Sequence, residues 1–296
     1  MRKITDAIKA GRIMLSDGAW GTLLHQKGLR PGECPELWCV DKPGEALCIA
    51  KSYIDAGADM IKTNSFGGNV LKLSRYGLSE RAAEINEAAA SISRQAAGSD
   101  RFVIASIGPT GKMLLMEDVS ERQLYDAFAA QAVSLEKGGA DAALIETMSD
   151  IGEAVQAVKA VKENTGLEVI CTFTFDQTVR GEYRTMMGAD PASAALAVIE
   201  AGADIAGANC GNGMEDMIEI ARTIRAAHKE VPILVHANAG LPTLVDGADV
   251  FPEGPEVMAS FVPRLIDVGV SVIGGCCGTT PAHTRAMKEA LRVLYG

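Results

Sequence analysis

Three cysteines are the residues of this sequence best suited to metal chemistry. Cys210 lies in the segment GANCGNG, and Cys276 and Cys277 are adjacent in GGCCGTTP. Zinc binds cysteine thiolates at about 2.3 Å, and a catalytic zinc keeps three protein ligands and one open position. The flanking glycines allow the backbone to approach a ligand closely. The three thiols therefore predict a zinc site with one coordination position open to a substrate.

The long gap between Cys210 and Cys276 is not a zinc-finger spacing, so two other interpretations stay open. The thiols are either buried apolar side chains or, for the adjacent pair, a strained vicinal disulfide. The remaining cysteines are interpreted as packing residues or loop thiols; they are Cys34, Cys39, Cys48 and Cys171.

A phosphate site competes for the same glycine-rich loop. Loops after the last two strands of a (β/α)8 barrel often bind phosphoryl groups at a helix N-terminus. In GGCCGTTPAH, Thr279 or Thr280 would be the N-cap and Pro281 the first helical residue. This alternative predicts a sugar-phosphate isomerase or an aldolase. An aldolase needs a lysine at a strand end, and Lys62 is the one candidate in the predicted strands.

Short β-branched runs alternate with longer helical stretches along the whole chain. Strands are expected at 12–16, 59–63, 102–107, 141–146, 169–175, 204–208, 232–236 and 270–274. Helices are expected at 44–56, 79–97, 120–138, 150–164, 190–201, 214–229, 255–268 and 281–294. This alternation predicts βαβ units in a single (β/α)8 TIM barrel. A doubly wound open sheet would have fewer strands and usually a phosphate fingerprint after the first strand.

A weak internal repeat indicates which side chains share one level of the barrel. Copies such as DAGADMIKT and EAGADIAGAN precede every second strand, and each contains a glycine suited to a helix end. Counting onward from the aligned positions reaches the carboxyl ends of these strands, where barrel active sites form. The residues predicted to lie there are Asn64, Ser65, Glu146, Thr147, Asn209, Cys210, Cys276 and Cys277.

Composition excludes several classes of protein. The chain has 296 residues and a formal net charge of −10, so no basic nucleic-acid-binding surface is expected. No apolar run is long enough for a membrane span, and the N-terminus lacks the apolar core of a secretory signal. Seven cysteines in such a chain indicate reduced thiols and a cytoplasmic location. We expect one domain over 1–296, with the barrel proper at about 12–294.

Seven segments together resemble the homocysteine S-methyltransferase family. They are DGAWGTLL (17–24), TNSFGGN (63–69), GPTGKML (108–114), ETMSD (146–150), GANCG (207–211), NAGLP (238–242) and GGCCGTTPAH (274–283). The resemblance is greatest to the N-terminal homocysteine-binding module of cobalamin-dependent methionine synthases. It covers nearly the whole chain and implies a (β/α)8 barrel.

The resemblance also implies roles for single residues. The zinc ligands would be Cys210, Cys276 and Cys277, which are also the catalytic residues, and Asn238 would be a fourth ligand without substrate. Acidic side chains at Asp17 and Glu146 would hold the homocysteine ammonium. Backbone amides near Gly18, Ala19 and Ser106 would meet its carboxylate.

Independently of the resemblance, Asp17 and Glu146 follow apolar strands, where a carboxylate needs a cation partner or solvent. A structural ion pair or a helix cap is the alternative for them. His236 is interpreted as a core histidine with satisfied ring nitrogens rather than as a metal ligand. Trp20 departs from the family pattern, which usually has methionine or another aliphatic residue at that position.

The implied function is zinc-dependent methylation of homocysteine to methionine. Because the sequence ends after its eighth predicted helix, the expected donor is a methylcorrinoid (cobalamin) carried by a separate partner protein. Betaine, S-methylmethionine or S-adenosylmethionine as donor, or a different acceptor with a corrinoid donor, are the alternatives. A phosphate-binding barrel enzyme and a non-enzymatic zinc or thiol sensor are the other classes considered.

Overall fold

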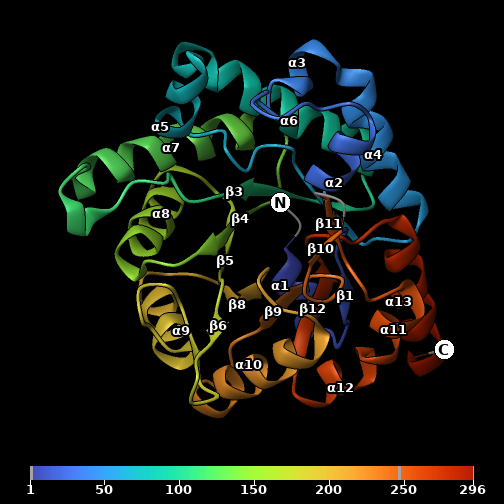
Figure 1. Ribbon diagram of the computed structural model, residues 1–296. Coiled ribbons are helices and arrows are strands. Elements are labelled where there is room, and N and C mark those ends of the chain that lie inside the picture. Colours follow the sequence, from blue (N-terminus) through green and yellow to red (C-terminus); the bar gives the residue numbers. More distant parts are fainter. Residues whose placement is uncertain (1–2, 246–247, 296) are drawn as a thin grey trace.

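The computed structural model describes residues 3–245 and 248–295 and contains an eight-stranded parallel sheet. The strands follow the order β1-β12-β9-β8-β5-β4-β3-β2, and Figure 1 shows them at the centre of a ring of helices. Their bounds are β1 Met14–Leu15, β2 Met60–Lys62, β3 Phe102–Ile107, β4 Ala142–Met148, β5 Glu168–Phe173, β8 Ile205–Asn209, β9 Ile233–Ala237 and β12 Val270–Gly275. The predicted (β/α)8 barrel is confirmed.

The outer helices match the predicted ones with one difference. They are α4 Pro43–Asp55, α6 Ala82–Ala97, α7 Glu121–Lys137, α8 Ile151–Asn164, α9 Pro191–Glu200, α10 Met214–Ala227, α11 Pro255–Ser260, α12 Val262–Asp267 and α13 Pro281–Tyr295. The single helix predicted at 255–268 is wrong, because the chain forms α11 and α12 there. Pro263 lies in the first turn of α12 and has no N–H to continue the preceding helix.

Short helices and strands that the sequence did not predict lie at both ends of the barrel. They are α1 Ile4–Lys9, α2 Gly21–Gln26, α3 Trp38–Asp41, α5 Val70–Leu73, and two hairpins, β6 Asp176–Gln177 with β7 Tyr183–Arg184 and β10 Thr243–Val245 with β11 Ala248–Val250. Both hairpins follow the carboxyl ends of barrel strands, so they lie on the side where barrel active sites form. No helix in the described part of the chain is long and apolar enough to cross a membrane.

Side-chain caps fix where several outer helices begin. Ser120 accepts a hydrogen bond from the Gln123 amide at 3.2 Å, and Gln123 Oε1 accepts one from the Ser120 amide at 2.9 Å. This reciprocal pair is a capping box that starts α7. Asp150 caps α8 through the Gly152 amide at 2.7 Å. The cap ends the short loop that follows β4, the strand that carries Glu146.

The seam between β1 and β2 is closed by a few hydrogen bonds instead of a continuous ladder. The Asp59 amide donates to the Leu15 carbonyl at 2.7 Å, and the Leu15 amide donates to Asp59 Oδ2 at 3.0 Å. Higher up, the Lys62 amide donates to Asp17 Oδ2 at 3.1 Å. Two buried aspartates therefore complete the barrel where strand pairing stops.

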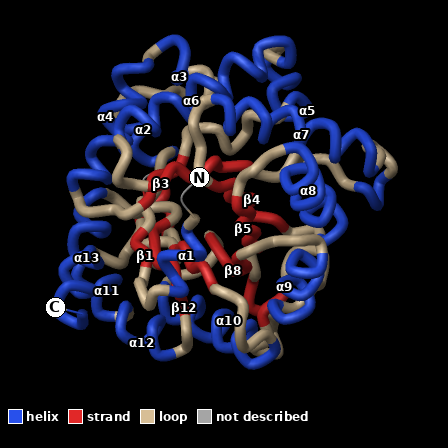
Figure 2. Tube along the Cα trace, turned by 180° about the vertical axis from the view of Figure 1, so that it is seen from behind, coloured by secondary structure: helices blue, strands red, loops and turns tan. Residues whose placement is uncertain are grey.

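The lower part of the barrel interior is an apolar layer. It contains Met14, Met60, Phe102, Ile104, Ala142, Leu144, Ile170, Ile205, Leu234 and Val272. Ile4 of α1 packs into the same layer and is fully buried. Figure 2 shows α1 lying over this end of the barrel. The Ile4 amide donates to Glu168 at the start of β5, which holds the helix in place.

Candidate active site

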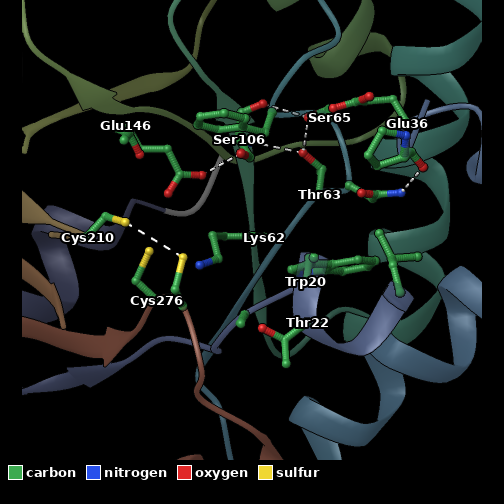
Figure 3. A pocket seen from close by; sticks show the side chains of 18 residues that line it. Trp20, Thr22, Glu36, Lys62, Thr63, Ser65, Ser106, Glu146, Cys210 and Cys276 are labelled. Carbon is green, nitrogen blue, oxygen red and sulfur yellow. Dashed lines mark hydrogen bonds between the residues drawn. The ribbon is translucent and has the colours of Figure 1, made fainter. Parts of the chain in front are cut away.

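The three cysteine sulfurs converge at the carboxyl end of the barrel. Cys210 follows β8, and Cys276 and Cys277 follow β12. The Sγ atoms of Cys210 and Cys277 are 3.7 Å apart, and all three Sγ atoms lie within 4.8 Å of one another (Figure 3). Four sulfurs at about 2.3 Å in a tetrahedron around zinc would be about 3.8 Å apart. The donor set and its spacing therefore fit a zinc ion.

Strand β9 holds both cysteine loops in position, because it lies between β8 and β12 in the sheet. The Cys210 amide donates to the His236 carbonyl at 3.0 Å, and the Cys276 amide donates to the Ala237 carbonyl at 2.7 Å. Cys210 also has a φ of +62°, a left-handed conformation that few residues other than glycine adopt. Strained backbone of this kind clusters at functional sites.

Asn238 positions the loop of Cys277. It is buried, and its Oδ1 accepts a hydrogen bond from the Cys277 amide at 3.1 Å. The backbone amide of Asn238 donates to the Asn212 carbonyl at 2.9 Å. The predicted role of Asn238 as a fourth metal ligand stays a prediction, since its oxygen is engaged with the loop in this structure.

Without a cation the thiols hold their protons. Hydrogen bonding with Cys210, together with burial, raises the pKa of Cys276 to about 12. Asn209 Nδ2 approaches Cys276 Sγ at 3.9 Å, and this is a weak contact. Because the thiolate is the form that binds metals, three thiols crowded within 4.8 Å of one another need a cation to ionise together.

A cavity of about 280 Å³ opens beside the sulfurs. It runs from the three cysteines past Lys62 and Glu146 to the aromatic side chains of Trp20 and Phe66. Seven of the eight residues predicted to share this level line it: Asn64, Ser65, Glu146, Thr147, Cys210, Cys276 and Cys277. The eighth, Asn209, donates to Thr147 Oγ1 at 2.8 Å. The internal repeat thus located the cavity.

Glu146 is a buried carboxyl group on the wall of this cavity. Ser106 Oγ donates a hydrogen bond to its Oε1. Burial raises the pKa of Glu146, while the positive charge of Lys62 and the Ser106 hydroxyl act in the opposite direction. One carboxyl oxygen is therefore fixed by Ser106, and a cationic group of a ligand would stabilise the ionised form.

Asp17 lies beneath the cavity and is fully buried. Its Oδ2 accepts from Trp20 Nε1 at 3.0 Å and from the Lys62 amide, and its Oδ1 is 3.8 Å from Lys62 Nζ. Burial raises the pKa of Asp17, an effect that Lys62 partly offsets. The structure thus shows the ion pair that was the alternative for this residue. A direct contact of Asp17 with a substrate ammonium stays a prediction.

Two of the three backbone amides predicted to meet a carboxylate have partners within the protein. The Ala19 amide donates to Thr279 Oγ1 at 3.1 Å, and the Ser106 amide donates to Thr63 Oγ1 at 2.9 Å. Gly18 is required by close approach, because a Cβ there would lie 2.5 Å from Thr279 Oγ1. Thr279 also donates to the Cys276 carbonyl at 2.7 Å, so it links the backbone at Ala19 to the loop of Cys276 and Cys277.

Two residues, Lys62 and His236, have surroundings that the sequence did not predict. Lys62 was considered only for aldolase chemistry, yet it lies between Asp17 and the cysteines. His236 is fully buried, and neither ring nitrogen has a hydrogen-bond partner in the described part of the chain. The predicted core position of His236 is confirmed, but the partners expected for its ring nitrogens are absent from the described residues. The signal for Lys62 was a lysine at an inward-facing position two residues after the buried Met60.

The competing interpretations of the cysteines are not favoured. Cys276 and Cys277 are free thiols, so the vicinal disulfide is absent from the described structure. The phosphate alternative needs free amides at the start of α13, but the Thr280 amide donates to His283 Nδ1 at 3.1 Å. Of the other cysteines, Cys34, Cys39 and Cys171 are buried and Cys48 is exposed.

Comparisons with known proteins agree with this geometry. The family model described as homocysteine S-methyltransferase matches residues 14–291. The chain is 32% identical to the methionine synthases of Mycobacterium leprae and Mycobacterium tuberculosis, over 95% of its own length in each case. It spans about a quarter of those relatives, 24% and 25% respectively.

A solved structure shares the fold. The metallated form of the homocysteine methyltransferase MmuM from Escherichia coli matches with a TM-score of 0.78 and 21% identity, covering 96% of this chain and 98% of that one. The family match covers all eight strands and the three convergent cysteines. The chain therefore belongs to the homocysteine S-methyltransferase family.

Proposed function

We propose that this protein methylates the sulfur of homocysteine to form methionine, using a zinc ion held by Cys210, Cys276 and Cys277. The convergence of the three sulfurs at tetrahedral spacing carries the proposal. The family match supports homocysteine as the acceptor.

The chemistry required is the conversion of a thiol into a nucleophile at neutral pH. A free thiol has a pKa near 8.5, so only a few per cent is thiolate at pH 7. A zinc ion in the site would deprotonate a coordinated thiol, whose proton passes to solvent. The sulfur–methyl bond then forms as the bond between the methyl group and its donor breaks, with the electron pair left on the donor.

The residues around the sulfurs supply binding and orientation. Glu146, fixed by Ser106, is suited to bind the ammonium group of the amino acid through charge-assisted hydrogen bonds. Trp20, whose indole N–H is fixed by Asp17, forms an apolar wall together with Phe66. These groups restrict the thiol to one orientation, and such positioning lowers the barrier of a two-reactant step.

We further propose that the methyl donor is a methylcorrinoid presented by a partner protein. Six exposed apolar side chains lie on segments that follow β3, β5 and β9 at the carboxyl end of the barrel. They are Leu115, Met116, Val179, Met186, Leu241 and Leu244. Exposed apolar residues at the end of the barrel where the cavity opens favour a docking surface for a large donor. A small donor such as betaine or S-methylmethionine would not need them.

The test combines metal analysis with a methyl-transfer assay. Purified protein is assayed for zinc and incubated with homocysteine and each donor in turn: methylcobalamin, a methylated corrinoid protein, betaine, S-methylmethionine and S-adenosylmethionine. We expect about one zinc per chain and methionine from the corrinoid donors. Turnover with a small donor alone would overturn the donor assignment. Zinc without any methyl transfer would favour a sensor, and activity on a sugar phosphate without metal would favour the phosphate-binding barrel.

A further inference from the structure

Thr147 has a backbone conformation that its residue type disfavours. It directly follows Glu146 in β4 and has a φ of +63°, in the left-handed region that glycine adopts readily. A β-branched residue is a genuine outlier there. Such a conformation persists only where the surrounding contacts hold it, and it is most frequent at functional sites.

The same residue lies in a β-bulge. The pairing of β4 with β5 shifts register between Ile145 and Met148. Successive residues of a regular strand point to opposite faces, yet Glu146 and Thr147 both line the cavity. A bulge re-aims side chains in this way and is common next to active sites. The direction of the Glu146 side chain therefore depends on the bulge.

The carboxamide of Asn209, the last residue of β8, holds Thr147 at two points. Its Oδ1 accepts a hydrogen bond from the Thr147 amide at 2.7 Å, and its Nδ2 donates to Thr147 Oγ1 at 2.8 Å. Because a backbone N–H can only donate, the oxygen of the carboxamide must face it, which fixes the orientation of Asn209. Asn209 is fully buried, so water does not replace these bonds when they are lost.

Asn209 connects two strands that are not neighbours in the sheet. Strand β5 lies between β4 and β8, so no backbone ladder joins the ends of these two strands. From β5, Thr172 Oγ1 donates to Asn209 Oδ1 at 2.7 Å, and beyond its end Thr174 Oγ1 donates to the Asn209 carbonyl at 2.9 Å. The residue after Asn209 is Cys210. The side chain of Asn209 thus links the bulge of β4 to the loop that carries this cysteine.

We propose that Asn209 is a positioning residue for methyl transfer: it holds the bulge at Thr147 and thereby fixes the Glu146 carboxylate relative to the three sulfurs. The inference rests on the proposed function, since Glu146 and the cysteines belong to that site. Figure 3 shows Glu146 and Cys210 facing the same space. The ammonium group and the sulfur of an amino-acid thiol are joined by a short chain, so their two binding groups must keep a matching separation.

The test compares two thiols in wild type and in a set of variants. L-Homocysteine carries the ammonium group that Glu146 is proposed to bind, and propane-1-thiol lacks it. Asn209→Leu removes the carboxamide at similar volume, and Thr147→Val removes only the bond to the hydroxyl group. The control Asn86→Leu removes another fully buried asparagine, which lies on α6 outside the cavity and donates two hydrogen bonds of 2.7 Å to backbone carbonyls.

Thiol binding is measured by calorimetry on zinc-loaded protein without a donor. We expect Asn209→Leu to weaken homocysteine binding by about 5- to 100-fold, the range for two lost hydrogen bonds, and propane-1-thiol binding by less than about twofold. Thr147→Val loses one of the two bonds and should weaken homocysteine binding by about 2- to 10-fold, so it serves if Asn209→Leu does not fold. In steady-state assays KM should rise in parallel while kcat changes less than about threefold. Asn86→Leu should bind both thiols as wild type does.

Two further measurements report on the bulge itself. In Asn209→Leu/Thr147→Gly, glycine adopts the positive φ without strain, so homocysteine binding should recover by about threefold or more relative to Asn209→Leu. Hydrogen exchange of the Thr147 amide needs no thiol, and it should be at least about tenfold faster in Asn209→Leu than in wild type. Asn86→Leu should leave this exchange near the wild-type rate.

Three results would overturn the assignment. Equal losses for homocysteine and propane-1-thiol would mean that Asn209 shapes the whole cavity and does not act through Glu146. Loss of zinc in Asn209→Leu would mean that it acts through Cys276, whose Sγ its Nδ2 approaches at 3.9 Å. Unchanged homocysteine binding would mean that the position of Glu146 does not depend on Asn209. Failure of the proposed function is distinguishable, because it appears in wild type as absence of zinc or of methyl transfer, while amide exchange still reports on the bulge.

Discussion

The lower and upper layers of the barrel interior are built by the same strands and are both buried, but the lower layer is apolar and the upper layer is polar. Two positions along a strand separate them, because inward-facing residues alternate with outward-facing ones. The lower member of each pair is apolar and the upper one is polar; the pairs include Met60 and Lys62, Ile104 and Ser106, Leu144 and Glu146, and Ile170 and Thr172.

The lower layer contributes mainly to the stability of the fold, and the upper layer contains the groups suited to chemistry. The lower layer is sealed by Ile4 of α1 and makes no polar contacts through its side chains, so burial of apolar area holds the strands together. The upper layer contains buried charges that are stable only because each has a partner, as Asp17 has Lys62. Substitutions in the two layers should therefore affect different observables.

The largest effect is expected from the cysteines. Cys276→Ala or Cys277→Ala should remove zinc and reduce methyl transfer about a thousandfold, because a bound metal contributes several kcal/mol to such reactions. The denaturation midpoint should stay near that of zinc-free wild type. Elemental analysis measures the metal, and Cys171→Ala, on β5 and outside the site, is the control that keeps it. Full zinc occupancy in Cys276→Ala would contradict the ligand assignment.

The opposite pattern is expected for the lower layer. Leu144→Ala should reduce the free energy of unfolding by about 2–5 kcal/mol, because it leaves a cavity in a fully buried apolar cluster. Zinc content and activity per folded molecule should remain close to wild type. Urea denaturation measures the first quantity and metal analysis the second. Loss of zinc at full stability would show that the two layers are not independent.

Glu146→Gln tests whether the Glu146 carboxylate of the upper layer binds the substrate. We expect zinc to be retained and KM for homocysteine to rise by about 10- to 100-fold, corresponding to about 1.5–3 kcal/mol for a charged hydrogen bond. Steady-state kinetics with homocysteine and with a simple alkanethiol separate the possible roles. An equal loss with the alkanethiol would show that Glu146 acts only on the structure of the cavity.

The smallest effect concerns Glu153, a buried carboxyl group outside the barrel. Its Oε1 accepts hydrogen bonds from the Thr110 amide and hydroxyl at 2.7 and 2.6 Å. Burial raises the pKa of Glu153, so the folded state binds the proton more tightly than the unfolded state. The stability from this group is present below the unfolded pKa and is lost as the pH rises through the folded pKa.

Glu153→Gln should therefore flatten the decline of unfolding free energy as the pH is raised above about 4.5. Urea titrations at a series of pH values measure the slope in both proteins. Identical slopes would mean that the carboxyl group is not buried in solution as it is in this structure.

The strands and the cavity were predictable for a common reason. The alternation of apolar runs and helical stretches located all eight strands, and the spacing of the Gly-Ala-Asp repeat brought Glu146 and Cys276 to one level. Parallel strands of similar length end at the same side of a barrel, so counting along the sequence is enough. The three cysteines at strand ends added residue types that can bind a metal.

Local features that depend on single contacts could not be predicted. Helix α1 has six residues, too few for a periodic pattern. Ile4 is its one buried residue, and it closes the lower end of the barrel interior. The pairing of Asp17 with Lys62 depends on the narrow seam between β1 and β2, which the sequence does not describe. The unsatisfied ring of His236 follows from its neighbours in the barrel, since Gly274, which lies against the ring, has no side chain that could bond to it.

The most direct test of the central claim is X-ray absorption at the zinc edge, with and without homocysteine. We expect three sulfur ligands and one lighter ligand in the protein alone. A fourth sulfur at about 2.3 Å should replace the lighter ligand when homocysteine is added. Zinc with fewer than three sulfur ligands, or a spectrum unchanged by homocysteine, would contradict the central claim.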